Sequence, residues 1–157
     1  MAILQDRTFI ERIAACYQHL AGVPLPQPEN VGDLARWIDE SAPYSLLAHG
    51  KSADPCFIYA NQSALRSFKY SREEILLLPS RLSAATPERQ ERQNMLTRLN
   101  TEGIVFGYSG IRITREGEAF NIYRGVIWQL TDRQGMSLGQ AALFWRSPEQ
   151  GLNDPDE

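Results

Sequence analysis

The stretch that decides the fold is Cys56-Phe-Ile-Tyr-Ala-Asn-Gln-Ser-Ala-Leu-Arg-Ser-Phe-Lys-Tyr-Ser-Arg-Glu-Glu-Ile-Leu-Leu-Leu-Pro79. Its opening apolar run, residues 56–60, has the length and the aromatic and β-branched content of a buried strand. Asn61 interrupts the run, and its side-chain oxygen is able to cap a helix by accepting a hydrogen bond from a free backbone N–H. Ser71 with Glu74 three residues later forms a capping-box pattern, and Pro79 ends that second helix. The stretch therefore predicts one strand followed by two short capped helices.

Towards the N-terminus, apolar residues recur at helical spacing from Ile3 to Leu20. Gly22 and the proline-rich segment 24–28 end this amphipathic helix. We expect residues 1–32 to form this helix and a stiff connector outside the core, and Asp33 to cap the first short helix of the main domain. If the apolar face of the N-terminal helix finds no room on its own sheet, a second copy of the chain is the usual partner. We therefore expect a homodimer through this helix.

Towards the C-terminus, residues 88–102 predict a longer helix that Gly103 ends. From Ile104 onward the hydrophobic period changes to two, which predicts strands at 104–107, 110–114, 119–130 and 137–145. With a strand at 44–49, the strand at 56–60 and three closing strands, of which 104–107 and 110–114 together form the first, the expected fold class is α+β: one five-stranded antiparallel sheet with helices on one face, plus the N-terminal helical extension. Residues 33–146 form the expected domain, and the tail 147–157 is expected to be disordered.

Composition excludes several classes of partner. The 157 residues suit one domain, and a net charge of −3 with no run of Lys and Arg offers nothing for nucleic acid or anionic lipid to bind. No apolar run has the length of a membrane span, and charged residues interrupt the place where a signal peptide needs its apolar core. Two cysteines do not make a disulfide framework. We expect a cytoplasmic protein without nucleic-acid or membrane partners.

Six short blocks resemble, in order, successive parts of the MEKHLA-type family, which is related to PAS sensory domains. They are Leu46-Leu-Ala-His-Gly50, Tyr59-Ala-Asn-Gln-Ser-Ala-Leu65, Leu78-Pro-Ser-Arg-Leu-Ser-Ala84, Tyr108-Ser-Gly-Ile-Arg-Ile113, Val126-Ile-Trp-Gln-Leu130 and Gly139-Gln-Ala-Ala142. The resemblance covers roughly residues 33 to 146 and implies a PAS-like fold in its free-standing bacterial form. It implies a non-enzymatic sensory or interaction module with an unknown signalling partner, and no catalytic residue.

Two departures bear on cofactors. The chain lacks the cysteine-containing flavin motif of photosensory PAS domains, and neither of its histidines lies where PAS haem ligands usually do. We therefore expect no cofactor with visible absorbance. Cys16, His19, His49 and Cys56 could in principle form a tetrahedral zinc site, but their pairs lack the tight spacing of such sites. The preferred interpretation is no metal, with small core cysteines and His49 bonded to backbone at a strand edge.

The strand at 119–130 poses one question. Its even positions are apolar except for Arg124, so alternation places this charge on the core face, where an unpaired charge costs several kcal/mol. Three explanations stay open: an internal carboxylate partner, a bulge that turns Arg124 outward, or a ligand pocket that holds a small anion.

The candidate ligand-binding residues follow from these strands. We expect a cavity between sheet and helices, lined by Arg124, Trp128, Gln140, Tyr108, Arg112 and Asn61, with Trp128 equally explained as a core residue. The expected function is small-ligand binding, protein–protein association, or both, in signalling. The alternative is an enzyme or carrier that uses the same cavity, but the core strands offer no carboxylate for an acid–base pair.

Overall fold

The computed structural model describes residues 2–83 and 89–149, with the side chains of residues 7–83, 90 and 93–149. Most of the tail expected to be disordered, and the predicted first residue of the long helix, Glu88, lie outside the described residues. The described helices are α1 (Ala2–Ala21), α2 (Leu34–Glu40), α3 (Gln62–Phe68), α4 (Arg72–Ile75), the short 3₁₀ helix η1 (Ser80–Ser83) and α5 (Arg89–Glu102). The described strands are β1 (Ser45–His49), β2 (Phe57–Ala60), β3 (Ile104–Ile113), β4 (Ala119–Thr131) and β5 (Ser137–Trp145).

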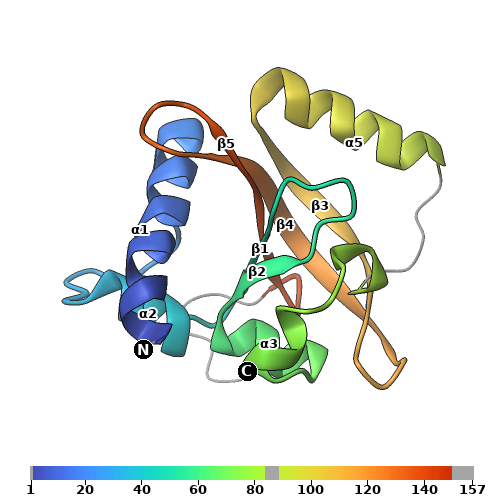
Figure 1. Cartoon of the computed structure of the whole chain (residues 1–157), viewed down its shortest axis with the longest axis horizontal. Helices are drawn as coiled ribbons and strands as arrows, with labels where there is room; N and C mark the ends of the chain where they lie inside the picture. Colours follow the sequence, from blue (N-terminus) through green and yellow to red (C-terminus); the bar gives the residue numbers. More distant parts are fainter. Residues whose placement is uncertain (1, 84–88, 150–157) are drawn as a thin grey trace.

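The five strands form one antiparallel sheet in the order β2-β1-β5-β4-β3. The α+β class and the five-stranded sheet expected from the sequence are confirmed. The first and the last strands of the chain are neighbours, because β5 inserts between β1 and β4 and forms the centre of the sheet (Figure 1). Every described helix is too short or too polar to span a bilayer.

The local capping predictions are confirmed. Asn61 accepts a hydrogen bond from the Ala64 N–H and begins α3. Ser71 and Glu74 form a complete capping box at the start of α4. Asp33 caps α2, and a hydrogen bond from Arg7 of α1 lowers the pKa of this carboxyl below its ordinary value. Short polar side chains at these positions satisfy the N–H groups that a helix leaves free at its first turn.

Helices cover the two faces of the sheet unequally (Figure 1). On one face, α1 and α2 bury what we call the α1-side core, whose members include Ile10, Ile13, Tyr17, Ile38, Tyr44, Leu46, Trp128, Leu130, Leu143 and Trp145. On the other face, α3 and α4 bury the cavity-side core, made of Leu47, Phe57, Ala60, Ala64, Leu65, Phe68, Ile75, Ile122 and Phe144. A smaller cluster under α5 contains Leu99, Val105 and Ile127.

The N-terminal helix belongs to the core, which corrects the sequence-based expectation. Ile10, Ile13 and Tyr17 of α1 are buried against the sheet, and the Trp128 indole Nε1–H donates to the Ile13 carbonyl at 3.3 Å. The connector after α1 allows the helix to pack across β4, so the apolar face of α1 is buried against the sheet of the same chain. The argument for a dimer through α1 thus loses its premise, while the dimer itself stays a prediction.

A bulge in β4 explains Arg124. Tyr123 pairs with Trp145 and Val126 pairs with Leu143, so two residues of β4 stand opposite one residue of β5. Arg124 has a φ of 52°, its side chain is exposed, and its guanidinium carbon lies 4.6 Å from the centroid of the Trp145 ring. Of the three open explanations, the structure shows the bulge that turns Arg124 outward.

The same bulge makes the alternation argument wrong for this strand. Before the bulge, Ile122 belongs to the cavity-side core, whereas after it Val126, Trp128 and Leu130 belong to the α1-side core. One extra residue exchanges the faces of all later side chains. The even positions of β4 therefore do not share one face, and Arg124 does not lie among apolar core residues.

Candidate functional site: a cavity between the sheet and helices α3 to α5

The smaller of two neighbouring hollows, which we call the main cavity, lies on the sheet face that α3, η1 and α5 cover. Its volume is about 220 Å³, and its apolar lining comes from both the sheet and the helices, including Leu47, Phe68, Ile127 and Phe144. Cavities that hold drug-sized ligands are usually about 300–1,000 Å³. The main cavity therefore has room for a compact ligand with an apolar middle.

Tyr108 and Arg112 form a polar wall of the main cavity on β3. One terminal N–H of Arg112 donates to the Tyr108 hydroxyl at 3.3 Å, and the guanidinium carbon lies 5.3 Å from the centroid of the Tyr108 ring. Among the described residues, no carboxylate pairs with Arg112. The same nitrogen, Nη1, also donates to the Ile111 carbonyl oxygen at 3.4 Å. A half-buried guanidinium held at one terminal nitrogen keeps its Nε and Nη2 N–H groups available for an anion.

Two glycines give Tyr108 its place over the sheet. A Cβ atom on Gly125 would lie 2.9 Å from the Tyr108 carbonyl oxygen, and one on Gly110 would lie 3.0 Å from the Tyr108 hydroxyl. Since Gly125 stands opposite Tyr108 in the register of β3 and β4, the ring is able to lie across the glycine positions. Gly110 and Gly125 thus leave room for the Tyr108 ring, and Ser109 between Tyr108 and Gly110 is exposed.

His49 and Gln140 form a second polar wall on β1 and β5. The two residues also line a neighbouring second hollow of about 390 Å³, which Lys51, Asn100 and Gln129 help to line. His49 Nδ1 lies 2.9 Å from the Gly50 carbonyl oxygen, so the predicted bond of His49 to backbone is confirmed. Neither hollow has an Asp or Glu among the described residues that line it.

The structure brings together three of the six candidate ligand-binding residues. Tyr108, Arg112 and Gln140 line the main cavity. Trp128 lies on the opposite face of the sheet, fully buried against α1, which favours the interpretation as a core residue. Arg124 is exposed beside Trp145 and lines neither hollow.

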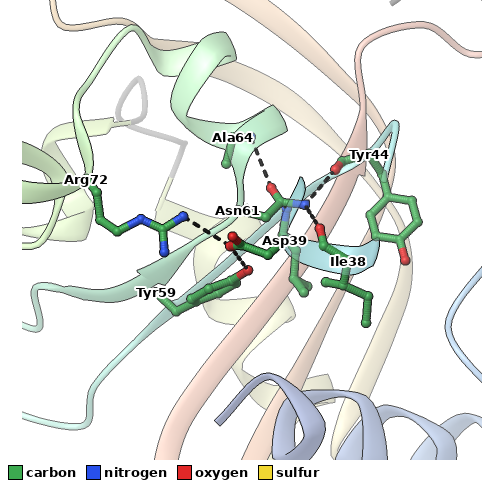
Figure 2. A network of polar contacts seen from close by, with 8 residues as sticks. Ile38, Asp39, Tyr44, Tyr59, Asn61, Ala64 and Arg72 are labelled. Carbon is green, nitrogen blue, oxygen red and sulfur yellow. Dashed lines mark hydrogen bonds and ion pairs between the residues drawn. The ribbon is translucent and has the colours of Figure 1, made fainter. Parts of the chain in front are cut away.

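Asn61, the sixth candidate, is a structural cap with all its hydrogen-bonding capacity in use (Figure 2). Its Oδ1 accepts from the Leu46 and Ala64 N–H groups, both at 3.0 Å. Its Nδ2 donates to the carbonyl oxygens of Ile38 at 2.9 Å and Tyr44 at 3.1 Å. An amide side chain offers two donors and one two-site acceptor, so no capacity is left for a ligand.

Asp39 is an interior carboxylate that the sequence analysis missed. Its side chain is only 3% exposed, and its Oδ1 accepts from the Tyr59 hydroxyl at 2.6 Å and from Arg72 at 3.0 Å (Figure 2). This network joins α2 to α4 around the edge strand β2. The signal was present in the sequence, since Ala35 and Asp39 lie four residues apart and share one helix face.

The residues weighed as zinc ligands do not form a cluster. Cys16 is buried, and its sulfur accepts from the Thr131 N–H at 3.4 Å, whereas the Cys56 sulfur lies 3.9 Å from the Leu77 carbonyl oxygen. In the part of the chain that the structure describes, no group of three or more His, Cys, Asp or Glu side chains is placed to hold a metal ion.

The fold is that of PAS domains. The PAS domain of a protein from Colwellia psychrerythraea matches with a TM-score of 0.61 and 13% identity, over 74% of this chain and 96% of that chain. A variant of Vivid matches with a TM-score of 0.57 and 19% identity, over 84% and 97% of the two chains. A light-oxygen-voltage domain studied with a flavin analogue matches with a TM-score of 0.54 and 16% identity, over 67% and 78%.

Within this fold, the chain belongs to the MEKHLA domain family, whose model matches residues 7–147. The matched range begins inside α1, whereas the sequence analysis began the domain at residue 33. The wider range agrees with the burial of α1 against the sheet. No curated protein matches the sequence.

Proposed function

We propose that this protein is a non-enzymatic sensory module that binds a small organic anion in the main cavity. The observation that carries the proposal is the Arg112 guanidinium, which lines an otherwise largely apolar cavity and has no carboxylate partner among the described residues. Burying a cation partly is costly unless an anion or hydrogen bonds compensate it. A ligand carboxylate is the group that a guanidinium binds best, through two parallel hydrogen bonds.

The position of the cavity supports a regulatory role. Its apolar floor includes Leu47, Ile127 and Phe144 from three neighbouring strands, and its cover includes Phe68 of α3 and Met95 of α5. A ligand in contact with both layers would change how α3 and α5 pack on the sheet. The PAS fold of the solved neighbours and the family membership agree with a sensory domain.

The lining chemistry favours binding over catalysis. The described residues around the main cavity supply one imidazole, one guanidinium and one phenol, but no carboxylate. The Arg112 and Tyr108 groups are held by each other and not by a base that would activate them. Such a lining orients a ligand without an evident acid–base pair.

Benzoate and phenylacetate test the proposal as compact aromatic anions. Their addition to the full chain is expected to raise its thermal unfolding midpoint with increasing concentration, because a ligand that binds only the folded state stabilises it. Arg112→Met should abolish most of the rise, while Arg36→Met, an exposed arginine of α2, should retain it. Equal responses of wild type and Arg112→Met would contradict the proposal.

A further inference from the structure

We propose that the second hollow is a separate binding site for a small neutral molecule with an amide edge, that is, an N–H donor beside a carbonyl acceptor. The inference goes beyond the proposed function, because it uses neither Arg112 nor the anion that Arg112 would bind. It follows from three uncharged polar side chains that line the second hollow, His49, Gln140 and Gln129, which we call the polar row.

The polar row is built by strand register. His49 of β1 pairs directly with Gln140 of β5, and Gln140 pairs directly with Gln129 of β4. Residues directly opposite each other on neighbouring strands point to the same face, with their Cβ atoms about 5 Å apart. The two neighbouring pairs of the row are therefore each within reach of one amide group, and Gln140 belongs to both pairs.

The second hollow lies between the polar row and α5. Ile127, two residues before Gln129 on β4, packs against Leu99 of α5, so alternation turns Gln129 towards the same helix. Leu96, Leu99 and Asn100 of α5 line the hollow opposite the row. Its volume is about 390 Å³. Ligand sites usually measure about 300–1,000 Å³, so the hollow has room for a small ring between the polar row and the two leucines.

Gly139 brings the end of β1 close to the polar row. Its φ is 132°, a conformation that favours glycine, and a Cβ atom here would overlap the His49 carbonyl oxygen. The same atom would lie 3.0 Å from the Gly50 Cα. Any side chain at this position would push β1 away from β5, so the glycine is necessary for His49 to lie beside Gln140.

The two glutamines of the polar row have unused hydrogen-bonding groups. Within the described part of the chain, neither the Gln129 nor the Gln140 side-chain amide has a protein hydrogen-bond partner, and both side chains are half-buried at the hollow. Each amide offers two N–H donors and one carbonyl acceptor. A ligand with a donor beside an acceptor pairs with such an amide on both sides at once.

The backbone determines what His49 offers. A carbonyl oxygen only accepts, so the contact of His49 Nδ1 with the Gly50 carbonyl oxygen at 2.9 Å places a proton on Nδ1. In the neutral ring, Nε2 is then an acceptor. At this end of the polar row, a ligand therefore has to supply an N–H or O–H group.

The charges around the second hollow favour a neutral ligand. Among the described residues that line it, Lys51 is the one charged side chain, and it is exposed. Water and salt screen a charge in that position. A carboxylate at the polar row would lose hydration without a buried cation to compensate it and would meet an acceptor at His49. A carboxamide instead donates an N–H to His49 and accepts from Gln140.

Three matched probes test the inference: benzamide, acetophenone and benzoate. They share one ring and differ in its substituent, which is a carboxamide, a methyl ketone or a carboxylate. Dissociation constants are measured by NMR titration of the isotopically labelled full chain at about pH 8, where imidazole is neutral. The signals of the Gln129 and Gln140 side-chain amides and of His49 Nε2 report contact directly. Gln129 lines the second hollow and not the main cavity, so its signal distinguishes the two sites.

Benzamide is expected to bind wild type about 2–10-fold more tightly than acetophenone, since its N–H groups add one or two neutral hydrogen bonds. It should shift the signals of all three members of the polar row. Gln140→Leu should remove the advantage of benzamide, because the amide contacts Gln140 in either neighbouring pair. The control Gln18→Leu, an exposed glutamine of α1, should change nothing.

Arg112→Met separates the second hollow from the anion site. It should leave benzamide binding unchanged. In this variant, benzoate should bind the polar row at least about tenfold more weakly than benzamide, because the row offers no buried cation.

The inference is overturned if benzamide and acetophenone bind equally, if benzamide leaves the Gln129 and Gln140 signals in place, or if Gln140→Leu keeps the full advantage of benzamide. Loss of benzamide binding in Arg112→Met would place the amide in the main cavity and overturn the inference as well. The anion site is contradicted by a different result, equal responses of wild type and Arg112→Met to benzoate. Each proposal therefore fails independently of the other.

Discussion

At the scale of single residues, Asn61 and Ser71 show that burial changes how much a helix N-cap contributes to stability. Both are helix N-caps, but Ser71 is exposed and makes one capping box, whereas Asn61 is fully buried and bonds four backbone groups. Those four groups come from α2, the start of β1 and α3 (Figure 2). Asn61 therefore holds three segments together that the capping pattern alone does not connect.

Asn61→Ala is expected to lower the free energy of unfolding by about 3–5 kcal/mol, because it leaves several buried N–H and C=O groups without partners. Ser71→Ala serves as the matched cap and should cost about 1 kcal/mol, since water replaces the lost bond. Chemical denaturation of both variants measures the difference. Similar losses in the two variants would show that the buried network contributes little beyond its cap.

Arg124 was a candidate for an interior cation that binds an anion, and its backbone conformation excludes this role. The charge looked interior by alternation, yet the left-handed backbone at this position puts the guanidinium outside against Trp145. The half-buried cation that faces the main cavity is Arg112 instead. Arg124 on β4 is therefore excluded as the residue that binds an anion in the main cavity, and Arg112 on β3 is the remaining candidate.

At the scale of elements, the bulge of β4 decides which residues meet the cavity. Tyr108 lies opposite Gly125, the second bulge residue, and a Cβ there would contact the Tyr108 backbone. Beyond the bulge, Ile127 and Gln129 face the hollows while Val126 and Trp128 face α1. The extra residue is therefore necessary for a strand that contributes to both cores in turn.

Deletion of Arg124 should abolish the folded state, because the remaining residues would either lose their pairing with β5 or exchange faces. Arg124→Ala keeps the residue count and should cost only about 1 kcal/mol, mostly the contact of the guanidinium with Trp145. Thermal unfolding followed by circular dichroism compares the two variants. A cooperative transition in the deletion variant near that of wild type would mean that the strand absorbs a shift in register.

At the scale of the whole molecule, α1 closes the face of the sheet opposite the cavity. Trp128 has Tyr17 at its edge, with ring centroids 5.0 Å apart, and its indole donates to the backbone of α1. Without this helix, a large apolar surface of β1, β4 and β5 would meet water. The protein is therefore a sheet between two helical layers.

Ile13→Ala is expected to destabilise the protein by about 2–5 kcal/mol, as a fully buried side chain leaves a cavity behind. Gln18→Ala, on the exposed side of α1, should change stability by no more than about 0.5 kcal/mol. Denaturant titration measures both. A small effect of Ile13→Ala would show that α1 contributes little to the core and is an extension outside it. Light scattering of the full chain tests the homodimer separately.

Most local structure was determined by the sequence alone. The caps at Asp33, Asn61 and Ser71, the helix end at Gly22 and the change of period after Gly103 depend on neighbours within a few residues, and all appear where the pattern placed them. The order of these elements, with six blocks similar to one family, was sufficient for the α+β fold. Such signals are readable because their physics is local.

The tertiary structure alone decided the two features that define the candidate site. A bulge adds one residue without a composition signal, and its effect on face appears only when β4 pairs with both β3 and β5. Likewise, strand register pairs His49 with Gln140 of the second polar wall across 91 positions, and packing of α1 on the sheet brings Ile13 to Trp128 across 115 positions. Alternation states which residues share a face only in a strand without a bulge, and only pairing with other strands shows where a bulge lies, which face is covered and by what.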